Sequence, residues 1–131
     1  DSSGWEAYVY EMQLKDKDDN IVSGPNLGTA QTSTKRNQTE TTPGIFDASM
    51  VFDGSESTSL ETEFGNGKLG KWISYTFNQG QWIHAIRVKG YSAASNSIPS
   101  WHIEYSMDDG SSWTKAWTAT NMGALWKEDS F

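Results

Sequence analysis

Short runs with a two-residue hydrophobic period, each bounded by turn residues, constrain this chain more than any other feature. In residues 73–77, Ile, Tyr and Phe alternate with Ser and Thr, and in residues 101–105, Trp, Ile and Tyr alternate with His and Glu. Successive side chains of a strand point to opposite faces, so this period indicates strands with one buried and one solvated face. No segment longer than about ten residues has a clean helical period. The pattern therefore predicts an all-β, antiparallel protein with little helix.

The length and composition predict a single domain covering residues 1–131. A chain of this length with 35% hydrophobic residues can build one hydrophobic core, and it shows no internal repeat. Seven Trp and five Tyr residues suit a β-sandwich, because large flat side chains fill the space between two sheets. The segments expected to form strands are 8–14, 71–77, 82–89 and 99–106.

A tight turn at residues 52–58, with the sequence FDGSEST, contains oxygen ligands suited to a hard cation. Calcium takes about six to eight oxygen ligands, many of them main-chain carbonyls. A Gly after the Asp lets the backbone curl so that carbonyls can face inward. Asp-Gly is also a common turn dipeptide, so a solvated turn explains the same residues.

The order of this turn and the following strands resembles the coagulation-factor 5/8 type C, or discoidin-like, superfamily, and within it the family-32 carbohydrate-binding modules. Those modules carry a DG-x-x-x-T turn, then W-I-x-x-x-F, I-x-V and S-x-D-G-x-x-W segments. The resemblance implies an antiparallel β-sandwich, the jelly roll of galactose-binding domains. The matching features here are Asp53-Gly54 to Thr58, Trp72-Ile73 to Phe77, Ile86 to Val88, and Ser106 to Trp113.

The resemblance also implies a structural calcium ion, held by Asp53, Ser55 and Thr58 and by Glu11, which reaches across from segment 8–14. That segment resembles the strand that usually closes this fold, and here it comes first. In the resemblance, the ion lies within the loop framework and does not touch the ligand. The chain also departs from the family: many relatives have Trp where this chain has Leu60, and the absence of Cys removes the disulfide that joins the termini of many animal members.

As to function, the resemblance implies a non-catalytic, lectin-like module for adhesion or glycan recognition, extracellular or at the cell surface. Its expected partner is a glycan, of the galactose type or with a related terminal sugar. A sugar has a face of C–H groups and a rim of hydroxyls, so its site needs an exposed aromatic ring and a few fixed polar groups. Several aromatic residues lie outside the strand alternation: Trp5, Phe64, Trp82, Tyr91, Trp117 and Trp126. Most of these are expected to close the ends of the core, and Phe64 and Tyr91 are favoured for the sugar because their loops are rich in Gly and Ser. The expected polar contacts are Arg36, Asn66, Asn96 and His102.

The charge and the residue types argue against other function classes. A net charge of −7 makes nucleic acid a poor partner, because phosphate binding needs clustered Lys and Arg. No apolar run is long enough for a transmembrane segment. His84 and His102 both lie within expected strands, and no catalytic motif accompanies them, so we do not expect an enzyme. The alternative function is a protein- or lipid-contacting adhesion or interaction domain without sugar binding. In either case we expect the chain to be part of a larger multidomain protein.

A second acidic segment, residues 16–20, resembles the opening of an EF-hand loop. It fails further along, because Ile21 stands where the loop needs Gly and Leu27 stands where it needs Glu. A hairpin turn accounts better for these residues, since Asp and Asn tolerate turn conformations.

Overall fold

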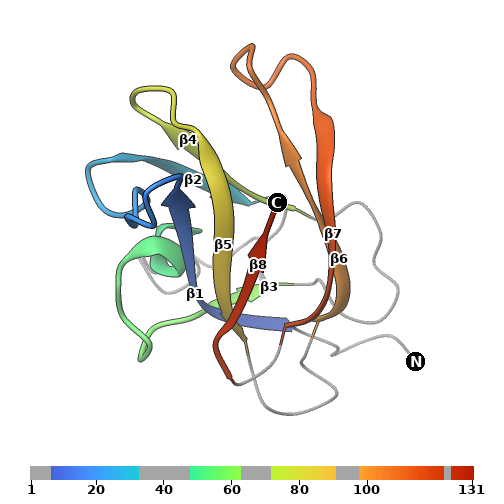
Figure 1. Ribbon diagram of the computed structural model, residues 1–131. Coiled ribbons are helices and arrows are strands. Elements are labelled where there is room, and N and C mark those ends of the chain that lie inside the picture. Colours follow the sequence, from blue (N-terminus) through green and yellow to red (C-terminus); the bar gives the residue numbers. More distant parts are fainter. Residues whose placement is uncertain (1–6, 33–47, 63–71, 91–97, 123–124) are drawn as a thin grey trace.

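The computed structural model describes residues 7–32, 48–62, 72–90, 98–122 and 125–131 (Figure 1). Every pair of neighbouring strands in this part of the chain is antiparallel, and the one helical element is a 3-10 helix. The prediction of an all-β, antiparallel protein with little helix is confirmed. The elements are β1 (Ala7–Asp16), β2 (Gly28–Thr32), η1 (Ala48–Phe52), β3 (Leu60–Thr62), β4 (Ile73–Phe77), β5 (Ile83–Gly90), β6 (Ile98–Tyr105), β7 (Thr114–Met122) and β8 (Lys127–Ser130).

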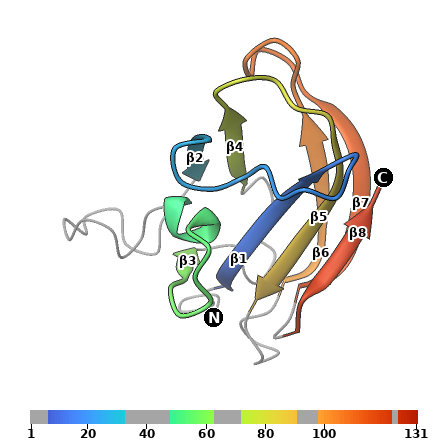
Figure 2. The ribbon, with the colours of Figure 1, turned by 60° about the vertical axis from the view of Figure 1, so that its left-hand side comes forward.

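The strands form one four-stranded sheet and two ribbons. The sheet has the order β3-β1-β5-β8, and the ribbons are β2-β4 and β6-β7. In Figure 1 the β2-β4 ribbon lies to the left of β5 and the β6-β7 ribbon to its right, and Figure 2 again shows β2 and β4 to the left of β5. The closure of these three pieces into a discoidin-like sandwich stays a prediction.

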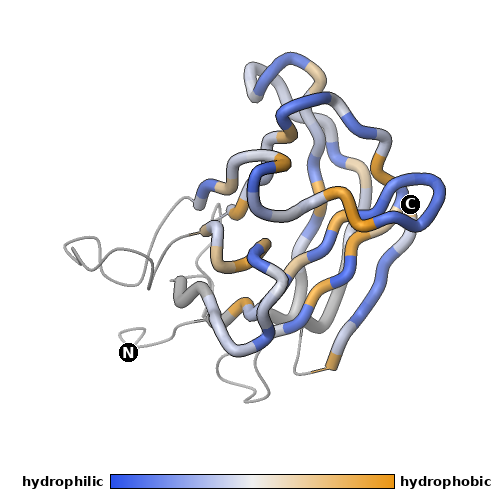
Figure 3. Tube along the Cα trace, turned by 90° about the vertical axis from the view of Figure 1, so that its left-hand side faces the viewer, coloured by the Kyte–Doolittle hydropathy of each residue, from blue (hydrophilic) through white to orange (hydrophobic). Residues whose placement is uncertain are grey.

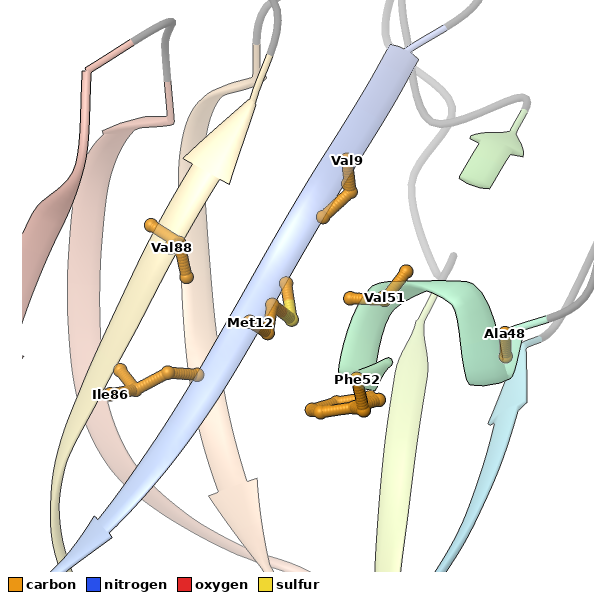
Figure 4. Packing of buried hydrophobic residues seen from close by; sticks show 7 residues of the cluster. All are labelled: Val9, Met12, Ala48, Val51, Phe52, Ile86 and Val88. Carbon is orange, nitrogen blue, oxygen red and sulfur yellow. The ribbon is translucent and has the colours of Figure 1, made fainter. Parts of the chain in front are cut away.

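The hydrophobic core lies where β1 and β5 meet η1. Val9, Val51 and Val88 are fully buried, and they come from β1, η1 and β5 respectively. Figure 4 shows Val51 and Phe52 of η1 on the side that faces β1, with Val88 and Ile86 on the neighbouring β5. Burying one such side chain contributes roughly 1.5 to 3 kcal/mol. Partly buried residues of both ribbons also pack against this cluster, among them Ala30, Ile73, Tyr75, Trp101 and Ile103.

The 3-10 helix η1 joins the sheet to the β2-β4 ribbon. The ring of Phe52 lies 4.7 Å, centroid to centroid, from the ring of Tyr75 on β4. Because Phe52 directly precedes the Asp-Gly turn, this packing fixes where the turn begins. Within the described ranges, no helix is long and apolar enough to span a bilayer.

Candidate functional site

The Asp53 turn is organised by the carboxylate of Asp53 itself. One carboxylate oxygen, Oδ1, accepts a hydrogen bond from the Ser55 amide at 2.8 Å, and Oδ2 accepts one from the Thr58 hydroxyl at 2.7 Å. Gly54 has a φ of 80°, a conformation that residues with a Cβ rarely adopt. A Cβ at Gly54 would meet no atom within 4 Å, so the backbone conformation, and not lack of space, favours glycine here.

Glu11 of β1 reaches this turn from 43 residues away. Its Oε1 accepts a hydrogen bond from the Gly54 amide at 3.2 Å. The residue is only 2% exposed, and its second oxygen, Oε2, is buried without a hydrogen-bond partner. Such an oxygen is unusual, because buried polar atoms are nearly always paired in native proteins. The structure therefore brings Glu11 to the turn that contains Asp53, Ser55 and Thr58, the four residues expected to hold calcium.

The pKa of Glu11 is strongly raised by its surroundings. Burial raises the pKa of this carboxyl to about 8 and the hydrogen bond from the Gly54 amide lowers it, while the negative charge of Asp53 and a hydrogen bond between the two carboxyl groups, which needs the proton on Glu11, both raise it. Two neighbouring carboxylates cannot both stay ionised away from water at low cost. Either a proton on Glu11 or a bound cation removes this repulsion.

The donor set around Glu11 fits a hard cation. Glu11 Oε2 is unpaired, whereas the Thr58 hydroxyl donates to Asp53 Oδ2 and the Ser55 hydroxyl is bonded to that of Ser57; all of these groups offer oxygen, the ligand type that calcium prefers. In the described part of the chain, no three His, Cys, Asp or Glu side chains converge on one point. A cation at Glu11 and Asp53 would therefore complete its shell with hydroxyl, main-chain and water oxygens.

Glu56, in the same turn, connects the turn to β5 and to the residue before β8. Its Oε1 accepts hydrogen bonds from the Lys89 ammonium of β5 and, at 3.0 Å, from the indole Nε1 of Trp126. Trp126 stands directly before β8, and the Arg87 guanidinium lies 4.5 Å from the centroid of its ring. The sequence offered no signal for this role, because the partners of Glu56 are 33 and 70 residues away.

The residues expected to contact a sugar fall mostly outside the described part of the chain. This applies to Arg36, Phe64, Asn66, Tyr91 and Asn96. His102, the sixth, lies on β6. Its side chain is exposed, and its Nε2 is 3.4 Å from a carboxylate oxygen of Glu104.

Two further acidic turns use their carboxylates to hold the backbone. Asp16 Oδ1 accepts hydrogen bonds from the amides of Asp18 and Asn20, and these bonds lower the pKa of Asp16. Hydrogen bonds from the hydroxyls of Ser112 and Ser106 lower the pKa of Asp108 to about 2. The prediction that residues 16–20 form a tight turn is confirmed, since Lys15 and Ile21 on its two sides form an antiparallel bridge.

Comparison of the chain with protein-family models, with curated proteins and with solved structures found no match.

Proposed function

We propose that this chain is a non-catalytic glycan-binding module of the discoidin-like type, with a structural calcium ion at Glu11 and the Asp53 turn. In this proposal it works in adhesion or glycan recognition, outside the cell or at its surface. The calcium ion stabilises the loop framework and does not contact the sugar.

The observation that carries the proposal is the buried, unpaired Oε2 of Glu11 beside the Asp53 turn. The motif resemblance links a strand and a turn that are 43 residues apart, and the Gly54 amide does donate to Glu11. A carboxyl that is 2% exposed beside a second carboxylate needs either a proton or a cation to offset the repulsion, and the motif resemblance favours the cation. A bound cation would neutralise the two carboxylates and would explain why they lie together.

Calcium binding is tested by thermal unfolding in calcium, in magnesium and in EDTA. If the free calcium is a few hundred times the dissociation constant, binding adds about 3 to 4 kcal/mol to the free energy of unfolding. We expect EDTA to lower the melting temperature, and Asp53→Ala to abolish this sensitivity. Asp109→Asn is the matched control, because Asp109 also precedes a Gly in a turn and Asn tolerates its φ of 61°. A melting temperature unaffected by EDTA in the unmodified chain would contradict the calcium site.

Glycan binding is tested on an array of neutral and acidic oligosaccharides, with calcium present. Binding to a defined terminal sugar supports the proposal. Binding only to lipid vesicles or to a protein, with no sugar bound, would instead support an interaction domain of another kind.

A further inference from the structure

The four-stranded sheet places a lysine directly beside Glu11. Met12 of β1 and Val88 of β5 are register partners in the core, so the neighbouring pair, Glu11 and Lys89, points to the opposite face of the sheet. Figure 3 shows hydrophilic and hydrophobic residues alternating along the central strands. Residues directly opposite in an antiparallel pair have Cβ atoms about 5 Å apart. The cationic side chain of Lys89 therefore starts next to that of Glu11.

Lys89 is bonded to a third carboxylate, that of Glu56. The Lys89 ammonium donates to Glu56 Oε1, and the indole Nε1 of Trp126 donates to the same oxygen at 3.0 Å. Glu56 follows Asp53 by three residues, and its negative charge contributes to the raised pKa of Glu11. Two donors thus hold the Glu56 carboxylate at a point from which its charge acts on the site.

Arg87, the next cation along β5, is engaged mainly elsewhere. It donates to the side chain of Gln13 at 2.8 Å, and its Nε lies 3.8 Å from Glu128 Oε1 of β8. The hydrogen bond from Lys89 is the largest cause of the lowered pKa of Glu56, and the charge of Arg87 is the smallest. Lys89 is thus the main counter-charge of Glu56.

The charges of this cluster add up to the opposite of one divalent cation. When ionised, Glu11, Asp53 and Glu56 carry three negative charges and Lys89 carries one positive charge, which leaves −2. The Lys89 side chain is 27% exposed, so water screens its charge only in part. A partly buried site pays for any uncompensated charge, so a net charge of −2 suits a divalent ion.

The unpaired Oε2 of Glu11 distinguishes this cluster from an ordinary charged surface. Glu11 is 2% exposed, and its other oxygen accepts from the Gly54 amide. The Glu56 side chain, in contrast, is 51% exposed. The cluster therefore has a buried part, where Glu11 lacks a partner, and a solvent-facing part, where Glu56 and Lys89 already satisfy each other.

We propose that Lys89 is an affinity-determining residue of the Glu11 site, which neutralises Glu56 and thereby fits the charge of the site to one divalent cation. This inference rests on the calcium ion of the proposed function and adds the residues that set its affinity and its charge selectivity. Without Lys89 the site has one excess negative charge. It then binds calcium more tightly, and it gains most for a trivalent ion, because Coulomb energy scales with the charge of the ion.

The test measures calcium affinity by calorimetry for the full chain and for Lys89→Met, Glu56→Gln and the two changes combined. Both substitutions remove a charge and keep most of the side-chain shape. Lys115→Met is the control, because Lys115 is an exposed residue of β7 that pairs with Glu104 of β6. Terbium, a trivalent ion that prefers oxygen ligands as calcium does, is the second probe. Melting temperatures in EDTA show that each variant is folded.

At low salt, we expect Lys89→Met to bind calcium about tenfold more tightly and Glu56→Gln to bind it about tenfold more weakly. The combined variant keeps the original charge, so its affinity should lie within about threefold of that of the unmodified chain. Lys89→Met should raise the affinity for terbium more than that for calcium, and Lys115→Met should change neither. High salt should reduce all of these differences.

The outcomes separate this inference from the calcium site itself. If the unmodified chain binds calcium and neither Lys89→Met nor Glu56→Gln changes the affinity, the role of Lys89 is wrong while the calcium site stands. A combined variant that binds as tightly as Lys89→Met would also overturn the inference, because the two charges would then not act as a pair. If the unmodified chain binds neither calcium nor terbium, both are wrong.

Discussion

At the scale of single residues, Glu11 shows what motif spacing can and cannot predict. The resemblance linked Glu11 to the Asp53 turn, and the structure places the Gly54 amide on its Oε1. The unpaired state of Oε2 was not foreseeable, because it depends on burial by the whole turn and on the direction in which the turn presents its donors. The sequence indicates which groups meet, whereas packing decides which of their atoms are satisfied.

The raised pKa of Glu11 predicts how stability depends on pH when no divalent cation is present. Its folded-state pKa of about 8 exceeds the ordinary 4.5, so the folded chain binds this proton more tightly than the unfolded chain. This contribution to stability is full below pH 4.5 and is lost as pH rises to 8. The loss is at most about 5 kcal/mol.

Glu11→Gln removes this titration. In EDTA, urea unfolding from pH 4 to pH 9 should show a smaller decline in stability for the variant than for the unmodified chain. Added calcium should restore the unmodified chain at high pH and leave Glu11→Gln unchanged. Equal pH slopes for the two proteins in EDTA would show that Glu11 does not carry the effect.

At the scale of elements, the strands with a clear two-residue period were predicted well. The expected segments 71–77 and 99–106 correspond to β4 and β6 within two residues at each end. β2, β3, β7 and β8 were not among the expected strands. β7 contains few large apolar residues, and β8 is the charged edge strand Lys127–Ser130. Charges on an edge strand discourage pairing with other chains, and they also hide the strand pattern.

In the β2-β4 ribbon, the two strands approach so closely at Gly28 that we expect only glycine to fit there. Gly28 pairs with Phe77, and a Cβ at Gly28 would overlap the Thr76 carbonyl and the Tyr75 ring. Gly28→Ala should therefore displace Tyr75 and lower the free energy of unfolding by about 1 to 3 kcal/mol. Urea unfolding measures this change.

The matched control is Gly80→Ala, because a Cβ at Gly80 would meet nothing within 4 Å. We expect it to change stability by no more than about 0.5 kcal/mol. Equal effects of the two substitutions would show that the close approach of β2 to β4 is not what requires glycine.

At the scale of the whole molecule, the Asp53 turn and the C-terminal strand are joined across the sheet. Glu56 bonds both Lys89 and Trp126, so the turn beside β1 is tied to the residue that introduces β8. Secondary-structure patterns could not predict this link, since it depends on the order β3-β1-β5-β8. Strand order depends on pairing between segments that are far apart in the sequence, so no single segment predicts it.

Glu56→Ala should loosen β8 while leaving the central strands intact. We expect faster amide hydrogen exchange in Lys127–Ser130 and unchanged exchange in β1, because β8 pairs only with β5 within the described sheet. Ser57→Ala, in the same turn, is the control. Unchanged exchange in β8 after Glu56→Ala would mean that the ladder with β5 holds the strand without help from the turn.

The central position of β1 has a consequence for biosynthesis. β1 is synthesised before the strand that covers it, since Gln13 meets Arg87 of β5 only after 74 further residues have been made. Until then, the apolar face of β1 lacks its main cover. Such long-range pairing slows folding, so this strand is the part of the nascent chain that most needs protection from premature association.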